Sequence, residues 1–296
     1  MNVLSLFDGM SCGQIALNRA NIQYNNYFAS EIDKNAIKVT QHHYPNTVQL
    51  GDVTKIEFIA SKIDLLIGGS PCQGFSFAGK QLNFDDPRSK LFFEYVRLID
   101  QCKPKYFLLE NVVTKKEYED VITKYLGVEP IKINSSLVSA QNRVRLYWTN
   151  IPNVKEPEDK NISLSDILED DSNINPSAIR GRRLYPDGKR KDYDKDYDKD
   201  IPITQCLEVR ATNTNKSNCL TTVDKDNVLT TMPIGRHPNA FKDKLPFRYY
   251  TLKEYERLQT IPENYTSVVS TSQAKKMIGN AWTVDVISHI FKNIEI

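Results

Sequence analysis

Cys72 is the residue of this sequence whose type and neighbours most strongly indicate chemistry. It lies in LLIGGSPCQGFSFAG, residues 65–79, where an apolar run gives way to glycines and a proline. Such a run is typical of a strand covered on both faces, and ligands of open α/β sheets bind beyond the carboxyl ends of the strands. A lone cysteine is more often an inert, half-buried thiol. The position of Cys72 and the stiff Pro71 before it favour a nucleophile that faces a cleft.

Three charged residues farther along the chain have the chemistry to support such a nucleophile. Glu110 ends the apolar run KYFLLEN, and Arg143 and Arg145 alternate on a β-like stretch, so both arginine side chains project to one face. A carboxyl group can hold or donate a proton, and a guanidinium is a permanent cation with a planar fork. Taken singly, a capping carboxylate and two surface arginines are the more common interpretations. Together with Cys72, these residues predict a catalytic site.

The turn after the first apolar run has the composition of a ligand-binding turn. Phe7-Asp8-Gly9 and Gly13 lie between a predicted strand and a predicted helix, where glycines let the backbone approach a ligand. Glu31 ends the second strand, about where a carboxylate meets a ribose in nucleotide-binding folds, and Asp52 follows a third short strand. The spacing Gly9-x-x-x-Gly13 is not G-x-G-x-x-G, which argues against a nicotinamide cofactor and leaves other adenosyl ligands open. A plain tight turn is an equally common alternative.

The elements that must position these residues alternate between strand and helix. We predict strands over residues 2–7, 26–32, 62–69 and 105–111, and helices over residues 14–20, 33–44 and 88–103. This alternation predicts an α/β fold with a doubly wound, mostly parallel sheet.

The composition and the residue pattern of the sequence change after about residue 150. Residues 151–245 are rich in Asn, Asp, Lys and Pro and lack long helical patterns; they include a basic run at 180–191 and a charged repeat at 191–200. From residue 246 the compact pattern returns, and AKKMIGNAWTVDVISHIFKNI predicts an amphipathic helix behind a Gly-Asn turn. We therefore predict a catalytic and cofactor-binding domain at 1–150, a smaller irregular inserted domain at 151–245, and a segment at 246–296 that completes the first domain.

Composition excludes several classes of protein. The 296 residues are 40% hydrophobic and 26% charged with a net charge of +2, which predicts an ordinary globular core and neither demands nor excludes a polyanionic partner. None of the five cysteines has C-x-x-C spacing, so neither a disulfide framework nor a zinc site is indicated. The start has no signal-peptide pattern and no run is long enough to cross a membrane. We expect a cytoplasmic protein without metal.

Six motifs taken together resemble those of the DNA cytosine-C5 methyltransferase family, of bacterial or phage type. They are SLFDGMSCG, GGSPCQGFSFAG, LLENV, SAQNRVRLY, RYYTLKEYERLQTIPENY and MIGNAWTVDV, in the family's order and spacing over most of residues 1–150 and 245–296. The resemblance implies a Rossmann-like fold of the S-adenosylmethionine-dependent methyltransferases. The middle region carries no such motif, and in this family that region is the target-recognition domain.

The resemblance also implies roles for individual residues. Cys72 would attack C6 of a flipped cytosine, Glu110 would act at N3, Arg145 would contact O2, and Arg143 would support the loop of Cys72. S-adenosylmethionine would supply the methyl group for C5, with β-elimination to follow. The implied cofactor pocket consists of Phe7, Asp8, Gly9, Cys12, Gly13, Glu31, Ile32, Asp52, Val53, Pro71, Leu91, Asn280 and Trp282.

Within that pocket, Glu31 would bind the ribose hydroxyls, Asp52 the adenine amino group, and Phe7 would pack near the purine. The loop from Gln73 to Arg88 would close over DNA. The DNA contacts we expect are made by Gln73, Ser76, Arg88, Gln141, Arg180, Arg182 and Arg183.

The expected partner is double-stranded DNA, bound by a monomer, with a cognate restriction endonuclease or without one as an orphan enzyme. One alternative is the tRNA-methylating branch of the same family, whose Cys-Phe-Thr block we do not find. A second is a DNA-binding regulator without activity, which predicts loss of Cys72 or Glu110. A third, an amino-methyltransferase, needs a second proline where Cys72 stands.

Overall fold

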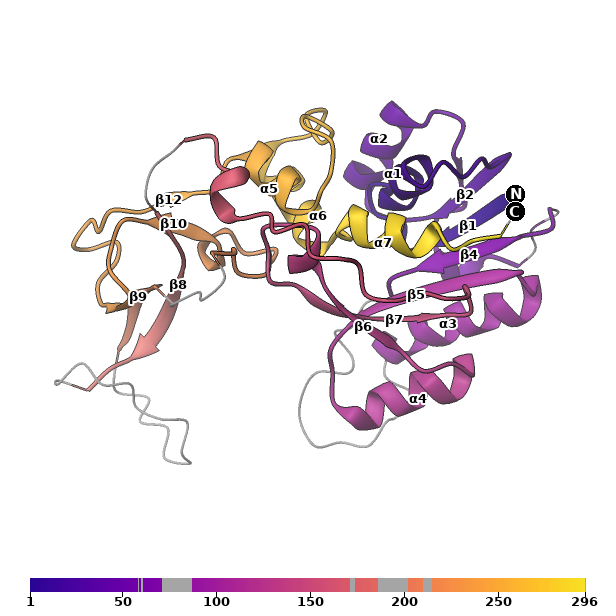
Figure 1. The fold of residues 1–296 in the computed structure, drawn as a ribbon, viewed down its shortest axis with the longest axis horizontal. Coiled ribbons are helices and arrows are strands. Elements are labelled where there is room, and N and C mark those ends of the chain that lie inside the picture. Colours follow the sequence, from indigo (N-terminus) through magenta and orange to yellow (C-terminus); the bar gives the residue numbers. More distant parts are fainter. Residues whose placement is uncertain are drawn as a thin grey trace.

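The computed structural model describes residues 1–57, 59, 61–70, 87–170, 174–185, 202–209 and 215–295. These residues form an α/β unit that is built from both ends of the chain and a smaller sheet that is built from its middle (Figure 1). The N- and C-terminal ends lie side by side on the α/β unit.

The α/β unit is organised around a seven-stranded sheet in the order β3-β2-β1-β4-β5-β7-β6. Strands β1 to β5 pair in parallel, whereas β7 runs antiparallel to both β5 and β6. The strands are β1 (Asn2–Leu6), β2 (Asn26–Ser30), β3 (Val48–Gln49), β4 (Leu65–Gly68), β5 (Tyr106–Val112), β6 (Ile131–Asn134) and β7 (Val144–Thr149). The mostly parallel sheet predicted from the sequence is confirmed.

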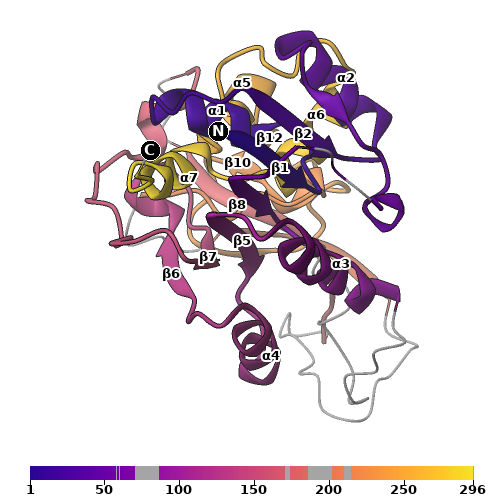
Figure 2. The same ribbon diagram turned by 90° about the vertical axis from the view of Figure 1, so that its right-hand side faces the viewer.

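Helices cover both faces of this sheet. In Figure 2, α1, α2 and α7 lie on one side of it, and α3 and α4 lie on the other. The helices are α1 (Cys12–Arg19), α2 (Lys34–His43), α3 (Pro87–Cys102), α4 (Lys116–Leu126), α5 (Leu252–Leu258), α6 (Thr271–Asn280) and α7 (Val284–Phe291). Helix α7 packs beside α1, so the last helix of the chain joins the layer formed by the first two.

The two layers follow from side-chain alternation along the buried strands. Leu65 and Ile67 of β4 belong to the core under α1 and α7, whereas Leu66 belongs to the core under α3. Successive side chains of a strand point to opposite faces, so a strand that is apolar at every position must be covered on both sides. The apolar run before Cys72 is therefore a strand covered on both faces, as predicted, and it lies in the middle of the sheet.

The middle of the chain forms a five-stranded antiparallel sheet in the order β11-β9-β8-β10-β12. Its strands are β8 (Asn175–Arg183), β9 (Ile203–Val209), β10 (Val228–Thr230), β11 (Gly235–His237) and β12 (Arg248–Tyr249). Ile179, Leu207 and Val228 form its small core. The sequence indicated only an irregular module here, so this sheet was not expected. We call residues 151–245 the insert.

The segment after the insert begins and ends its helices with clear local signals. Thr251 caps α5 and accepts a hydrogen bond from the backbone N–H of Glu254, whose side chain accepts one from Thr251 in return. Helix α6 ends at Asn280, Ala281 is extended, and α7 begins at Val284. The predicted last helix is confirmed as α7, but Gly279 and Asn280 lie within α6 and the break between the helices follows them.

In the described part of the chain, no helix is both long and apolar enough to cross a membrane. In that same part, no three His, Cys, Asp or Glu side chains are grouped in a way that could hold a metal ion.

Candidate active site

A cavity of about 490 Å³ opens where β1, β2, β4 and β5 end. Residues from these strand ends line it together with residues from β7, from α6 and from the turn between α6 and α7. Its lining residues are Phe7, Asp8, Gly9, Met10, Cys12, Glu31, Asp33, Ala36, Gly69, Ser70, Glu110, Asn111, Val112, Arg143, Arg145, Met277, Gly279, Asn280, Ala281 and Trp282. The position matches the rule that open α/β sheets bind ligands at the carboxyl ends of their strands.

The first turn of the chain forms part of the cavity wall in a strained conformation. Phe7, Gly9 and Ser11 have φ values of 58°, 60° and 60°, the left-handed region that non-glycine residues rarely adopt. The backbone N–H of Asp8 donates to the carbonyl of Ser30 over 3.1 Å. Strain of this kind persists only where surrounding contacts hold it, and it gathers at ligand sites.

Glu31 is the main anchor of this turn. Its Oε2 accepts a hydrogen bond of 2.8 Å from the N–H of Gly9, and its Oε1 accepts from the N–H groups of Ile32 at 2.7 Å and Asp33 at 2.8 Å. The carboxylate therefore fixes both the first turn and the end of β2. It still lines the cavity, and each of its oxygens retains acceptor capacity.

Two groups of the turn, Asp8 and Cys12, have perturbed acidity. Burial raises the pKa of the Asp8 carboxyl to about 6, opposed by hydrogen bonds that it accepts from the hydroxyls of Ser11 and Tyr27. Burial also raises the pKa of the Cys12 thiol to about 12, so Cys12 stays protonated at neutral pH. Cys12 is therefore not an alternative nucleophile to Cys72.

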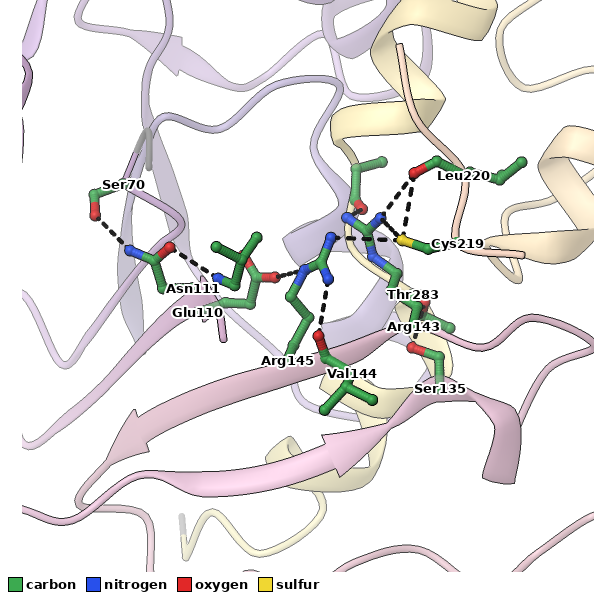
Figure 3. A network of polar contacts seen from close by, with 12 residues as sticks. Ser70, Glu110, Asn111, Ser135, Arg143, Val144, Arg145, Cys219, Leu220 and Thr283 are labelled. Atoms are coloured by element: carbon green, nitrogen blue, oxygen red, sulfur yellow. Dashed lines mark hydrogen bonds and ion pairs between the residues drawn. The ribbon is translucent and has the colours of Figure 1, made fainter. Parts of the chain in front are cut away.

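Glu110 and the two predicted arginines meet in the wall of the cavity, where Figure 3 shows them in one polar network. Arg145 Nε lies 2.9 Å from Glu110 Oε1, and Arg145 Nη1 donates to the Val144 carbonyl at 2.8 Å. Arg143 is only 3% exposed. Its Nη2 donates to the carbonyl of Ala281 at 2.9 Å, which joins β7 to the α6–α7 turn.

The predicted cofactor residues divide into two groups. Phe7, Asp8, Gly9, Cys12, Glu31, Asn280 and Trp282 line the cavity, and Gly13, Ile32, Asp52, Val53 and Leu91 are not among its lining residues. Ile32 is 74% exposed beside Glu31. Asp52 Oδ1 accepts from the N–H of Thr54 at 3.0 Å and from its hydroxyl at 2.8 Å, and these hydrogen bonds lower the pKa of Asp52.

Gly13 is a packing glycine in this structure. A β-carbon on Gly13 would lie 2.5 Å from the hydroxyl oxygen of Tyr27 and 2.6 Å from Cδ1 of Ile67. Its lack of a side chain lets α1 lie close against β2 and β4.

Several predicted residues lie outside the described ones. They are Pro71, Cys72, Gln73 and Ser76, and with them most of the loop that we expect to close over DNA. Arg88 lies in α3, but its side chain is not described. Gly69 and Ser70, which immediately precede Pro71, line the cavity.

Gln141, which we expected to contact DNA, is buried in this structure. Its side chain is completely buried, and its amide donates to the carbonyl of Leu258 at 2.8 Å and to Oε1 of Gln259 at 2.9 Å. Its own Oε1 accepts from the N–H of Leu220 at 3.0 Å. The expected DNA contact does not fit this position, because Gln141 has no surface to offer.

The three predicted phosphate-binding arginines lie on β8 of the insert. Arg182 forms a two-pronged ion pair with Glu208, with Nε–Oε1 and Nη2–Oε2 distances of 2.7 and 2.8 Å. Arg180 lies 3.8 Å from Asp226. Arg183 lies opposite Ile203 of β9. Glu208 thus holds the Arg182 fork in one orientation, and Arg182 lowers the pKa of Glu208 to about 2.

Sequence reasoning missed Cys219, which comes from the insert and contacts both site arginines. Its Sγ lies 3.4 Å from Arg143 Nη1 and 3.8 Å from Arg145 Nη2 (Figure 3). Nothing in the local pattern of KSNCLTT could have indicated this, because the contact depends on how the insert returns to β7.

The fold and the site together define an α/β protein with a ligand cavity at the strand ends and a carboxylate-arginine pair in its wall. A family profile described as C-5 cytosine-specific DNA methylase matches residues 1–295. The chain belongs to this family.

Relatives with curated names support the assignment. The chain is 32% identical to the type II methyltransferase M1.ScrFI of Lactococcus lactis subsp. cremoris, over 97% of this chain and 76% of that protein. It is 29% identical to the type II methyltransferase M.HpaII of Haemophilus parainfluenzae, over 98% and 88%. The orphan methyltransferase M.Rho11sI of Bacillus phage rho11s is 42% identical over 50% of this chain and 32% of its own length.

Solved structures share the fold. The Entamoeba histolytica methyltransferase EhMeth superposes with a TM-score of 0.69 at 18% identity, covering 99% of this chain and 97% of that one. The S. pombe Dnmt2 methyltransferase superposes with a TM-score of 0.65 at 21% identity, covering 99% of this chain and 97% of that one. The predicted methyltransferase fold is confirmed.

Proposed function

We propose that the protein methylates C5 of cytosine in double-stranded DNA, with Cys72 as the nucleophile and S-adenosylmethionine as the methyl donor. The observation that carries the proposal is the cavity itself, where Glu110, Arg143 and Arg145 meet the first turn and the Asn280–Trp282 segment. The family assignment and the named type II relatives agree with this activity.

The cavity's lining suits an adenosyl cofactor. Glu31 offers carboxylate oxygens to ribose hydroxyls, and the aromatic rings of Phe7 and Trp282 offer flat apolar surface to a purine or a thioether. Ile32, which follows Glu31 directly, is exposed and offers further apolar surface to such a ligand. S-adenosylmethionine supplies an electrophilic methyl group on a sulfonium sulfur.

The residues of the chain account for the remaining chemistry. The Cys72 thiolate forms a bond to C6 of the cytosine, which makes C5 electron-rich. Glu110 holds a proton at N3, and Arg145 faces the charge that develops at O2. After methylation, the proton on C5 passes to solvent, its bonding electrons restore the C5–C6 double bond, and the bond between C6 and Cys72 breaks, which releases Cys72 as the thiolate. A stacked base cannot be reached from both sides, so the target cytosine must be flipped out.

The insert is proposed as the target-recognition domain, and residues 1–150 and 246–296 as the catalytic domain. The protein would act as a monomer, either beside a cognate endonuclease or as an orphan enzyme like the phage relative.

The experiment is bisulfite sequencing of DNA from a host that lacks cytosine methylation and expresses the chain. We expect 5-methylcytosine in one sequence context, and none with Cys72→Ala. The active chain should also form a covalent complex with DNA that carries 5-fluorocytosine in that context, and the variant should not. A folded, soluble chain that leaves DNA unmethylated in every context would disprove the proposal, as would methylation of RNA alone.

A further inference from the structure

The insert returns to the catalytic unit directly beside the site arginines. Ser217 forms a parallel β-bridge with Gln141: its N–H donates to the carbonyl of Ala140 at 2.7 Å, and its carbonyl accepts from the N–H of Asn142 at 2.9 Å. Lys216, only 6% exposed, donates to three backbone carbonyls of the catalytic unit and the start of the insert. The segment 215–221 is therefore held tightly against the residues that lead into β7.

The close approach continues as far as helix α6. A β-carbon on Gly279 would lie 2.5 Å from the carbonyl oxygen of Thr221, so only glycine fits there. Between these two attachments, Cys219 is placed at the ends of both guanidinium groups, as Figure 3 shows. The position of its thiol is thus set by backbone contacts on both sides.

The three guanidinium nitrogens of Arg145 each have a partner, and the partners come from different places. Nε pairs with Glu110 at 2.9 Å, Nη1 donates to the Val144 carbonyl at 2.8 Å, and Nη2 donates to Cys219 Sγ at 3.8 Å. Glu110 and Val144 belong to the catalytic sheet. Cys219 is the contact that the insert provides.

The thiol also lies between two like charges. Arg143 Nη1 donates to Cys219 Sγ at 3.4 Å and to the Leu220 carbonyl at 3.4 Å. Among the described residues, no carboxylate forms an ion pair with Arg143, whereas Glu110 pairs with Arg145. Because the sulfur lone pairs accept from both guanidinium groups, the thiol offsets part of their repulsion and fixes the plane of the Arg145 fork.

We propose that Cys219 is a positioning residue for Arg145, through which the insert sets the orientation of an arginine in the active site. The inference rests on the proposed function, in which Arg145 meets charge on the cytosine. In the proposed function the insert selects the DNA substrate. The same insert would then also hold a catalytic arginine in the orientation that the reaction needs.

The test compares Cys219→Ala, which removes the acceptor, with Cys219→Ser, whose hydroxyl oxygen can accept from both arginines. We expect Cys219→Ala to lower kcat on DNA about tenfold, because misplacement of a catalytic group acts on the transition state. KM for S-adenosylmethionine should not change. Cys219→Ser should keep most of the activity. The control is Cys102→Ala, a half-buried thiol on α3, which should behave as the wild type.

Wild-type kcat in Cys219→Ala, or equal losses in the alanine and serine variants, would overturn the inference while leaving the proposed function intact. If the wild type itself fails to methylate DNA, a second measurement decides. Unfolding midpoints of Cys219→Ala, Arg145→Met and the double variant should be non-additive, since the two side chains interact. Additive shifts would mean that no such interaction exists.

Discussion

Glu110 and Arg145 form a diagonal ion pair across two antiparallel strands. In the β5–β7 register Glu110 lies opposite Tyr147 and Arg145 lies opposite Val112, yet Arg145 Nε is 2.9 Å from Glu110 Oε1. Their side chains are 12% and 14% exposed, so neither charge is well solvated without the other. The two groups that we assign to N3 and O2 of the cytosine are therefore aligned with each other before a substrate arrives.

Glu110→Gln should leave cofactor binding intact and slow methyl transfer. The amide keeps the shape of the side chain but cannot hold the proton at N3, a loss on the order of 10²- to 10⁴-fold. Single-turnover transfer to DNA measures the rate, and equilibrium binding of S-adenosylmethionine is measured separately. Glu117→Gln, on the exposed start of α4, is the control. An unchanged transfer rate would contradict the role of Glu110.

Gly13→Ala should destabilise the fold by overpacking. Its β-carbon would lie 2.5 Å from the Tyr27 hydroxyl and 2.6 Å from Cδ1 of Ile67, a clash that costs roughly 1–3 kcal/mol. Urea unfolding measures the loss. Gly127→Ala is a useful comparison, because there the strain comes from φ of +70° alone, with no atom within 4 Å. Adding Ile67→Val to Gly13→Ala should restore part of the stability, and a purely additive double variant would disprove the clash.

Asp8→Asn should remove a pH dependence of stability. Burial raises the pKa of Asp8 to about 6, above the value of roughly 3.9 in an unfolded chain. Between these values the folded protein binds more protons at Asp8 than the unfolded chain, so the unfolding free energy falls as the pH rises, by about 3 kcal/mol in total. Above about pH 6 the penalty stays constant.

Urea unfolding at pH 4.5 and 7.5 compares the wild type with Asp8→Asn. The variant should lose less stability than the wild type on going to the higher pH. Asp120→Asn, on the exposed face of α4, should follow the wild type. If Asp8→Asn has the wild-type pH dependence, Asp8 is not the titrating group.

Tyr265→Phe should weaken cofactor binding more than catalysis. The Tyr265 hydroxyl donates to the carbonyl of Met10 at 2.8 Å, and the Tyr265 ring stacks on His43 with centroids 4.0 Å apart. Removing the hydroxyl leaves a buried carbonyl of the strained turn without its partner, at a cost of about 1–3 kcal/mol. We expect KM for S-adenosylmethionine to rise several-fold with kcat nearly unchanged.

The matched control is Tyr250→Phe, whose hydroxyl contacts Ser217 at 2.9 Å, away from the turn. It should lose stability without a change in KM for S-adenosylmethionine. Equal KM values in the two variants would show that Tyr265 supports the fold and not the turn.

The features that could be predicted from the sequence are those that depend on the local pattern of apolar and polar residues. The fully apolar run before Cys72 requires cover on both faces, so its place at the centre of the sheet followed directly. Glu110 and Arg145 could be assigned to one site because both belong to stretches with strand-like patterns, whereas their ion pair was not predicted. The sheet of the insert could not be predicted, since NPSAIRGRR of β8 has no alternation of apolar and polar residues.

The surroundings of two other residues, Gln141 and Cys219, could not be predicted from the sequence for a different reason. Gln141 was assigned to DNA on the basis of its motif, and its burial depends on Leu220 and Leu258, which are distant in the sequence. The contacts of Cys219 likewise depend on the return path of the insert. Both are set by where three separate segments meet, which no local pattern encodes.

The cavity is walled by the first turn at residues 7–12 and by residues 277–282, on either side of the whole insert. During synthesis on a ribosome, the first turn emerges long before Ala281 can accept the hydrogen bond of Arg143 or Trp282 can complete the wall. A nascent chain that has already made the insert therefore still lacks one part of the cavity wall. The complete cavity can form only after α6 and α7 have been made, when α7 packs beside α1.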